Sequence, residues 1–153
     1  MVKTFKSWGP SFKVEFDIKV TKLPRSEYTN VFHFLIGKYK SGDRYGDRIP
    51  ALWIRRTTCS FHIVSAVNGN RNYWKDFRFE FGKQYHITIQ QLKVSGNYYY
   101  EIIIDGASKF KILNTMAKKY YNVKMYASDP WHQAFTSHFG SISAIKTQQS
   151  KKL

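Results

Sequence analysis

Residues 12–20 alternate without interruption between apolar and polar side chains, and this pattern limits the chain to a fold built on β-sheet. The segment reads Phe-Lys-Val-Glu-Phe-Asp-Ile-Lys-Val. Successive side chains of a strand point to opposite faces of a sheet, so one face of this strand is predicted to be buried and the other to meet solvent. One buried face and one wet face are typical of an antiparallel sheet.

Further strand-like segments follow at regular intervals and are separated by turn residues. They are expected at residues 31–36, 51–56, 60–67, 85–91, 98–104, 109–113, 122–127 and 140–146. The Asn-Gly pair at 68–69 and the Asp-Gly pair at 105–106 are hairpin signals. About ten short strands with almost no helix predict an all-β sandwich or barrel. The one helical candidate is residues 114–120, with Asn114 as its N-cap.

The length of 153 residues fits one domain with a core of its own. We assign residues 1–146 to a single sandwich domain and expect the polar, basic residues 147–153 to fray. Cys59 is the only cysteine, so a disulfide within the chain is impossible. The sequence contains no segment that resembles a signal peptide, and no apolar run long enough to span a membrane.

The chain is strongly basic. It carries 25 Lys and Arg residues against 10 Asp and Glu residues, a formal net charge of +15. A field of this size attracts polyanions such as nucleic acid or sulfated glycan. The sequence has no recognised nucleic-acid motif, and its positive charge is not gathered into one stripe. Binding of nucleic acid or another polyanion, through basic residues and surface aromatics, is therefore kept as the alternative hypothesis about function.

Several segments follow one another in the order found in a known family. Residues 82–87 read glycine, two variable residues, aromatic, His and hydrophobic; residues 102–106 are a hydrophobic run with Asp-Gly; residues 122–143 hold a strand, an Asp-Pro turn and a last strand entered through glycine. In this order they resemble the laminin-G-like or concanavalin-A-like lectin/glucanase jelly-roll domains.

This resemblance implies both a fold and a role. The implied fold is a two-sheet antiparallel jelly-roll sandwich. The resemblance also implies that the domain is extracellular or secreted. The implied role, as in cell adhesion, is that of a non-catalytic recognition module. Its rim loops would bind a glycan, with an acidic glycan favoured, or an extracellular protein.

The basic loop that follows residue 36 is the first candidate ligand site. Arg side chains bind sulfate, carboxylate or phosphate through paired hydrogen bonds, and Tyr rings add stacking. The residues expected to bind are Lys38, Lys40, Arg44, Tyr45 and Arg48. The alternative is a solvated loop in which Asp43 and Asp47 pair with their basic neighbours.

Residues 68–74 and 129–138 are the two other candidate sites. An exposed Trp or Tyr can stack on a sugar ring while Asn and Arg bond the hydroxyl groups. The residues expected to act in this way are Asn70, Arg71, Tyr73, Trp74, Trp131 and His132. The alternative for residues 68–72 is an ordinary hairpin turn, which Asn-Gly favours.

The acidic residues do not form a catalytic set. Glu15-Phe16-Asp17 begins like the Glu-x-Asp-x-x-Glu strand of laminarinase-like glucanases, but Val20 stands where the second Glu is needed. The lone Cys59 has no nucleophile motif around it. We therefore predict that the chain is not an enzyme.

No cofactor is expected, and a calcium site is considered only for rim-loop carboxylates. Calcium prefers several oxygen ligands, including anionic ones. The three carboxylates considered are Asp43, Asp47 and Asp129. Basic residues or a proline adjoin each of them, which argues against such a site. The histidines at 33, 62 and 86 lie within expected strands and are interpreted as hydrogen-bonded sheet residues.

Overall fold

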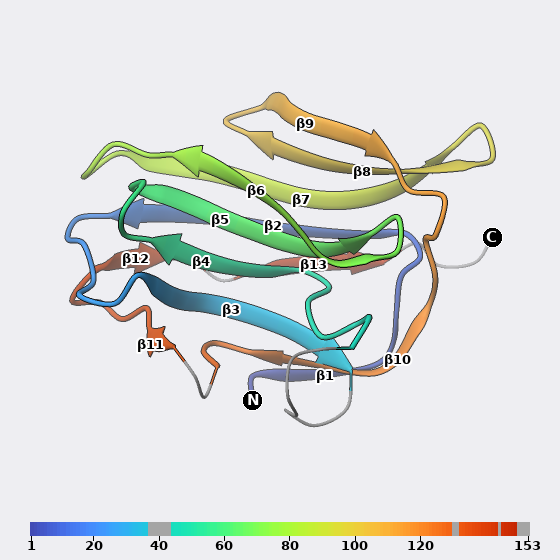
Figure 1. Cartoon of the computed structure of the whole chain (residues 1–153), viewed down its shortest axis with the longest axis horizontal. Coiled ribbons are helices and arrows are strands. Elements are labelled where there is room, and N and C mark those ends of the chain that lie inside the picture. Colours follow the sequence, from blue (N-terminus) through green and yellow to red (C-terminus); the bar gives the residue numbers. More distant parts are fainter. Residues whose placement is uncertain (37–43, 130–131, 144, 150–153) are drawn as a thin grey trace.

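The computed structural model describes residues 1–36, 44–129, 132–143 and 145–149. Within these ranges every regular element is a strand, and the strands form two sheets (Figure 1). No helix in the described part of the chain is long and apolar enough to cross a membrane. The expected all-β sandwich of two sheets is confirmed.

One sheet has seven strands. Its order is β1 (Lys3–Trp8), β10 (Tyr120–Tyr126), β3 (Tyr28–Ile36), β4 (Ala51–Arg55), β5 (Ser60–Val67) and β6 (Asn70–Arg78), and β11 (Gln133–Ala134) also pairs with β3. All of these pairings are antiparallel except that of β11, which runs parallel to β3. Because β6 is the last strand of this sheet, it forms one of its edges.

The second sheet has six strands and is antiparallel throughout. Its order is β12 (Gly140–Ile142), β2 (Phe12–Val20), β7 (Gln84–Val94), β8 (Asn97–Ile104) and β9 (Ala107–Leu113), and β13 (Lys146–Gln149) also pairs with β2. The strand β9 forms an edge of this sheet. Within this sheet β7, β8 and β9 are joined by hairpins, whereas β2 and β7 are neighbours from distant parts of the chain.

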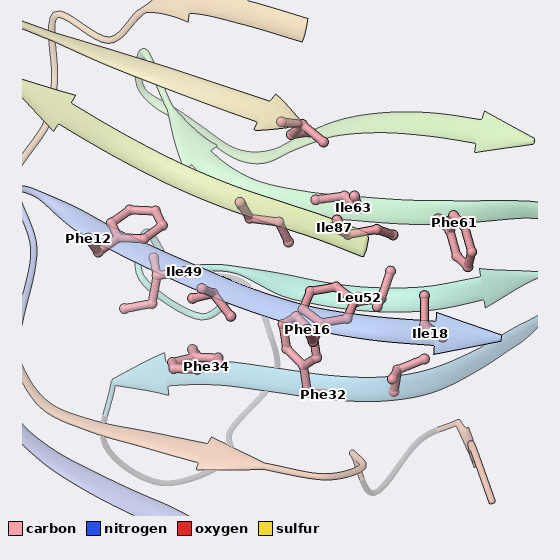
Figure 2. Close-up of a cluster of buried hydrophobic side chains, with 14 of the residues drawn as sticks. Phe12, Phe16, Ile18, Phe32, Phe34, Ile49, Leu52, Phe61, Ile63 and Ile87 are labelled. Carbon is pink, nitrogen blue, oxygen red and sulfur yellow. The ribbon is translucent and has the colours of Figure 1, made fainter. Parts of the chain in front are cut away.

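The core lies between the two sheets, and the alternation in β2 predicts which of its side chains enter it. Phe12, Val14, Phe16, Ile18 and Val20 are all buried, while the residues between them are partly exposed. Figure 2 shows Phe12, Phe16 and Ile18 of this strand beside side chains of the facing sheet. The ring of Phe16 meets that of Phe32 edge to face, with 5.1 Å between centroids. Burial of such apolar surface is the main stabilising contribution to a domain of this kind.

The expected helix at residues 114–120 is wrong. The chain makes a turn at Thr115 and Met116 and enters β10 at Tyr120. The buried amide of Asn114 explains the difference, because it bonds across the fold. Its oxygen accepts from the backbone N–H groups of Asn68 and Met116, at 3.0 and 3.1 Å. The residue expected to cap a helix instead ties this connection to the β5–β6 hairpin.

The expected last strand, residues 140–146, is divided into two short strands. β12 and β13 both pair with β2, at opposite ends of it. Residues 147–149, which were assigned above to a fraying tail, lie in β13 and continue the sheet. The remaining residues of that tail, 150–153, lie outside the described residues.

Candidate functional site

A hollow of about 370 Å³ lies on the outer face of the seven-stranded sheet. The side chains of Leu52 and Ile54 belong to the core between the sheets, so Trp53 points to the opposite face. The same alternation applies to β5 and β6. The residues that line the hollow are Tyr28, Arg48, Trp53, Arg55, His62, Val64, Asn72, Trp74 and His132.

The register of three neighbouring strands brings these residues into rows. Trp53 of β4 lies opposite His62 of β5, which lies opposite Asp76 of β6. In the next row Val64 of β5 lies opposite Trp74 of β6. Side chains directly opposite one another on one face of an antiparallel pair are close enough to interact. The floor of the hollow is therefore fixed by backbone hydrogen bonds rather than by a loop.

Aromatic rings form the walls and floor of the hollow. Trp74 is 51% exposed and its indole lies 5.4 Å from the His62 ring, centroid to centroid. Tyr28 meets His62 edge to face at 5.2 Å. Trp53 is buried beneath them. The most exposed aromatic surface in the hollow is therefore the indole of Trp74, since Tyr28 is only partly exposed.

A chain of ionic hydrogen bonds runs along one side of the hollow. The Arg55 guanidinium donates from Nε to Glu27 Oε1 at 3.1 Å and from Nη1 to Asp76 Oδ2 at 2.9 Å. The other oxygen of Asp76 lies 2.6 Å from His62 Nδ1. Glu27 is held in turn by the backbone N–H of Thr57, at 3.1 Å. Arg55 thus compensates two carboxylates, and Asp76 orients the imidazole.

The environment of His62 favours its neutral form. Burial lowers the pKa of His62 below its ordinary value, and the nearby charges of Arg55 and Arg48 act in the same direction, although the bond to Asp76 opposes them. From that bond we assign the proton of the neutral ring to Nδ1, which leaves Nε2 as an acceptor. His62 therefore provides a hydrogen-bond acceptor in the lining of the hollow.

Arg48 and Asn72 supply donors on another side of the hollow. Arg48 Nη1 donates to Asn72 Oδ1. The same guanidinium lies 5.8 Å from the centre of the Trp53 ring, within the range of a cation–π interaction. Because Arg48 comes from the segment between β3 and β4 and His132 precedes β11, the hollow combines sheet residues with two loop residues.

The carboxylate of Asp129 holds two lining residues of the hollow, Trp53 and His132, by hydrogen bonds. Its side chain is fully buried, with 0% exposure. It accepts hydrogen bonds from Trp53 Nε1 at 3.1 Å and from the backbone N–H of His132 at 2.7 Å, and His132 Nδ1 lies 2.8 Å from Oδ2. The His33 ring is also near, with Nδ1 at 3.9 Å. Asp129 therefore positions Trp53 and His132, two residues that line the hollow.

The carboxylates considered for calcium lie in different settings. The Asp47 carboxylate accepts from Arg44, at 2.7 Å from the backbone N and 3.2 Å from Nη2. Asp129 faces the N–H donors described above, and Asp43 lies outside the described residues. Within the described ranges, no group of three or more His, Cys, Asp or Glu side chains is arranged to hold a metal ion.

The structure brings three of the sequence-predicted binding residues into the hollow and places the others elsewhere. Arg48, Trp74 and His132 line it. Tyr45 stacks on Tyr120 at 6.4 Å. The expected residues outside the lining are Arg44, Tyr45, Asn70, Arg71 and Tyr73, and Lys38, Lys40 and Trp131 lie outside the described residues.

Two features of β6 and its turn explain these placements. Tyr73 and Trp74 are adjacent, so only one of them can face the hollow. Tyr73 points to the core side and packs against Phe110 at 5.8 Å. Asn68 and Gly69 have left-handed backbones, with φ of 50° and 79°, as the hairpin alternative expects.

Sequence reasoning missed Tyr28 and treated His62 as an internally bonded sheet residue. His62 does bond Asp76, but it also lines the hollow. Trp53 and Arg55 lie in the expected strand 51–56 and were not among the expected binding residues. The signal that could have found them is the alternation within 51–55, 60–67 and 70–78, which puts aromatic and charged residues on one face. That signal is complete only when the register of the three strands is known.

The comparisons with known proteins give a fold without a sequence family. No family model and no curated protein sequence matches this chain. A SAP-like pentraxin from Limulus polyphemus matches 95% of it with a TM-score of 0.59 and 12% identity. A variant of alginate lyase A1-II′ matches 94% of it with a TM-score of 0.54 and 13% identity. A variant of human galectin-16 matches 97% of it with a TM-score of 0.50 and 12% identity.

These matches define the class of fold. The chain has the concanavalin-A-like jelly-roll fold, as the sequence predicted, and the laminin-G-like variant of this fold is compatible with them. The match covers 95% of the galectin, but only 66% of the pentraxin and 63% of the lyase. The chain therefore spans just under two thirds of the length of these last two proteins.

The prediction that the chain is not an enzyme needs correction. It relied partly on the expectation that jelly-roll domains of this type usually catalyse nothing. The alginate lyase has this fold and is an enzyme by name. At 13% identity the likeness concerns the fold alone, so the fold does not exclude catalysis.

Proposed function

We propose that the hollow over β3–β6 binds a glycan. The observation that carries this proposal is the half-exposed indole of Trp74, which stands beside polar groups held in fixed positions. A sugar ring has an apolar face and a rim of hydroxyl groups. A site for it needs an aromatic surface and a few well-placed donors and acceptors.

The polar groups around Trp74 have the chemistry to hold hydroxyl groups. Arg48 and Asn72 are joined by a hydrogen bond and supply N–H donors. His62 supplies an acceptor at Nε2, which its bond to Asp76 keeps in place. The volume of about 370 Å³ is at the lower end of the range for ligand sites, about 300–1,000 Å³. It suits one or two sugar residues.

An acidic glycan is the finer form of this proposal. The net charge of +15 attracts anionic chains over a distance. Within the hollow the two cationic residues are Arg48 and Arg55, and the acidic form of the proposal assigns the carboxylate or sulfate to Arg48, the one that comes from the segment between β3 and β4. The alginate lyase, which shares the fold, acts on a polysaccharide, and this supports a saccharide ligand at the level of class.

A glycan array read at two salt concentrations tests the proposal. Binding to acidic glycans that weakens at high salt is the expected result. Binding to a neutral sugar that resists salt would support the hollow but not the acidic form. Preferential binding of single-stranded DNA with a steep salt dependence would favour the nucleic-acid alternative instead.

A matched pair of variants assigns any binding to the hollow. Trp74→Ala and Phe81→Ala each remove an aromatic side chain that is 51% exposed. Only Trp74 lines the hollow, so only Trp74→Ala is expected to weaken binding, by about tenfold or more. Equal affinity of the two variants for the best array ligand would show that the hollow is not the site.

A further inference from the structure

A second recess, of about 500 Å³, opens at the side of the sandwich between β6 and β9. These are the last strands of the two sheets, and the ring contact of Tyr73 with Phe110 brings them near each other. Figure 1 shows β9 as the outermost strand of its sheet. No described strand pairs with the outer edge of either β6 or β9. Both edges therefore present backbone groups that another strand could bond.

The bottom of this recess is apolar. Phe61 is fully buried, and Ile104 and Tyr85 are only 6% and 7% exposed. Each of them belongs to the core between the sheets. The recess is thus the open side of the sandwich, where the core lies closest to solvent.

The rim of the recess is cationic. Arg78, Lys83 and Lys109 line it, and Arg78 and Lys109 are exposed. Neither Arg78 nor Lys109 forms an ion pair with any residue that the structure describes. Lys83 has Glu80 within 3.7 Å, on the surface.

The two aspartates in the lining are engaged elsewhere. Asp76 bonds Arg55 and His62 on the hollow side of β6. Asp105 Oδ1 accepts the backbone N–H of His86 at 2.8 Å. Asp76 is compensated by Arg55, whereas Asp105 keeps its negative charge, and the three cations of the lining outnumber its two carboxylates, so the recess carries a net positive charge.

The charge of β9 also decides which strands can pair with it. Lys109 and Lys111 are its charged residues, and it carries no acidic one. Lysines on an edge strand oppose pairing with a second copy of the same edge, because like charges would then face each other. An extended segment that carries carboxylates has the opposite charge to β9, so no such repulsion arises. It would be attracted by the lysines and could complete the hydrogen bonds of the edge.

We propose that the recess binds an extended acidic segment of a partner protein. The segment adds a strand to the free edge of β9 and places apolar side chains over Phe61 and Ile104. Its carboxylates meet Arg78 and Lys109. This site is separate from the glycan-binding hollow and does not depend on it.

A labelled peptide provides the first test. The probe is an eight-residue peptide of alternating Glu and Val with fluorescein at its N-terminus, and binding is followed by fluorescence anisotropy. The same peptide with Lys in place of Glu should not bind. Lys109→Glu should weaken binding about tenfold, because it removes one ion pair and adds a repulsion. Lys119→Glu changes the net charge equally at an exposed site outside the recess, and should change affinity less than twofold.

Hydrogen exchange provides the second test and separates the alternatives. The peptide should slow exchange of the amides at 107–113, and Trp74→Ala should leave peptide affinity unchanged. Equal losses in Lys109→Glu and Lys119→Glu would overturn the proposal. A second result would also overturn the proposal: a sulfated oligosaccharide displaces the peptide, and the peptide leaves the amides of β9 unprotected. The recess would then bind negative charge without adding a strand.

Discussion

Replacement of Asp129 by Asn should lower the stability of the domain more than its single-atom change suggests. The Asp129 side chain has 0% exposure and faces N–H donors from Trp53 and His132 on both of its oxygens. In Asp129→Asn one oxygen becomes an NH₂ group. Whichever way the amide turns, this NH₂ faces a donor, and two buried polar groups lose a partner.

The size of the effect follows from that count. Each buried polar group left without a partner costs about 1–3 kcal/mol, so the two groups together predict a loss of about 2–6 kcal/mol in unfolding free energy. For a chain of this length, about 1 kcal/mol corresponds to about 2–4 °C in melting temperature. Asp129→Asn should therefore melt about 4–24 °C below the wild type.

Differential scanning calorimetry measures this effect, and Asp17→Asn is the matched control. Asp17 also loses one negative charge and also bonds a histidine, since its Oδ1 lies 2.7 Å from His86 Nδ1. Its side chain is 41% exposed, so water can replace the lost partner. The control should melt within about 2 °C of the wild type. Melting temperatures of the two variants that agree within that margin would refute the anchoring role of Asp129.

Two further predictions concern pH and strand β12. Because the folded pKa of His62 is lowered from an unfolded value of about 6.5, its contribution to stability is complete above that pH and is lost as the pH falls below it. Urea unfolding at pH 7.5 and 5.5 should therefore show a smaller loss for His62→Gln than for the wild type, and an equal loss would contradict the assignment. Gly140→Ala should destabilise the domain by about 1–3 kcal/mol, because a Cβ there would lie 2.0 Å from the backbone oxygen of Lys19. Wild-type stability with unchanged amide protection in β12 would show that the strand moves aside without cost.

The alternation of apolar residues predicted the strands well because it reflects burial directly. Every apolar residue of 12–20 enters the core, as its position in the pattern indicates. The segment 114–120 failed because local preference cannot foresee a distant partner. Asn114 has the chemistry of a helix cap, but Asn68, 46 positions earlier in the chain, competes for its side chain.

The candidate site was predicted only in part, for a related reason. Arg48 and Trp74 stand out by residue type, and both line the hollow. His62 and Tyr28 do not stand out, because their role depends on which residues of other strands lie opposite them. The register between strands depends on the whole sheet, and it cannot be derived from a single sequence. Rim loops were expected to carry the site, whereas most of the lining comes from the sheet itself.

In β4, β5 and β6, inward-facing core residues alternate with outward-facing residues of the hollow, and this alternation has a practical consequence. The side chains of Leu52 and Ile63 pack in the core between the two sheets. Their sequence neighbours Trp53 and His62 point to the outer face and line the hollow. Outward positions can therefore be randomised as a set while the inward positions stay constant. A library built in this way would alter what the molecule recognises and leave the scaffold intact, and its paratope would be as rigid as the sheet that carries it.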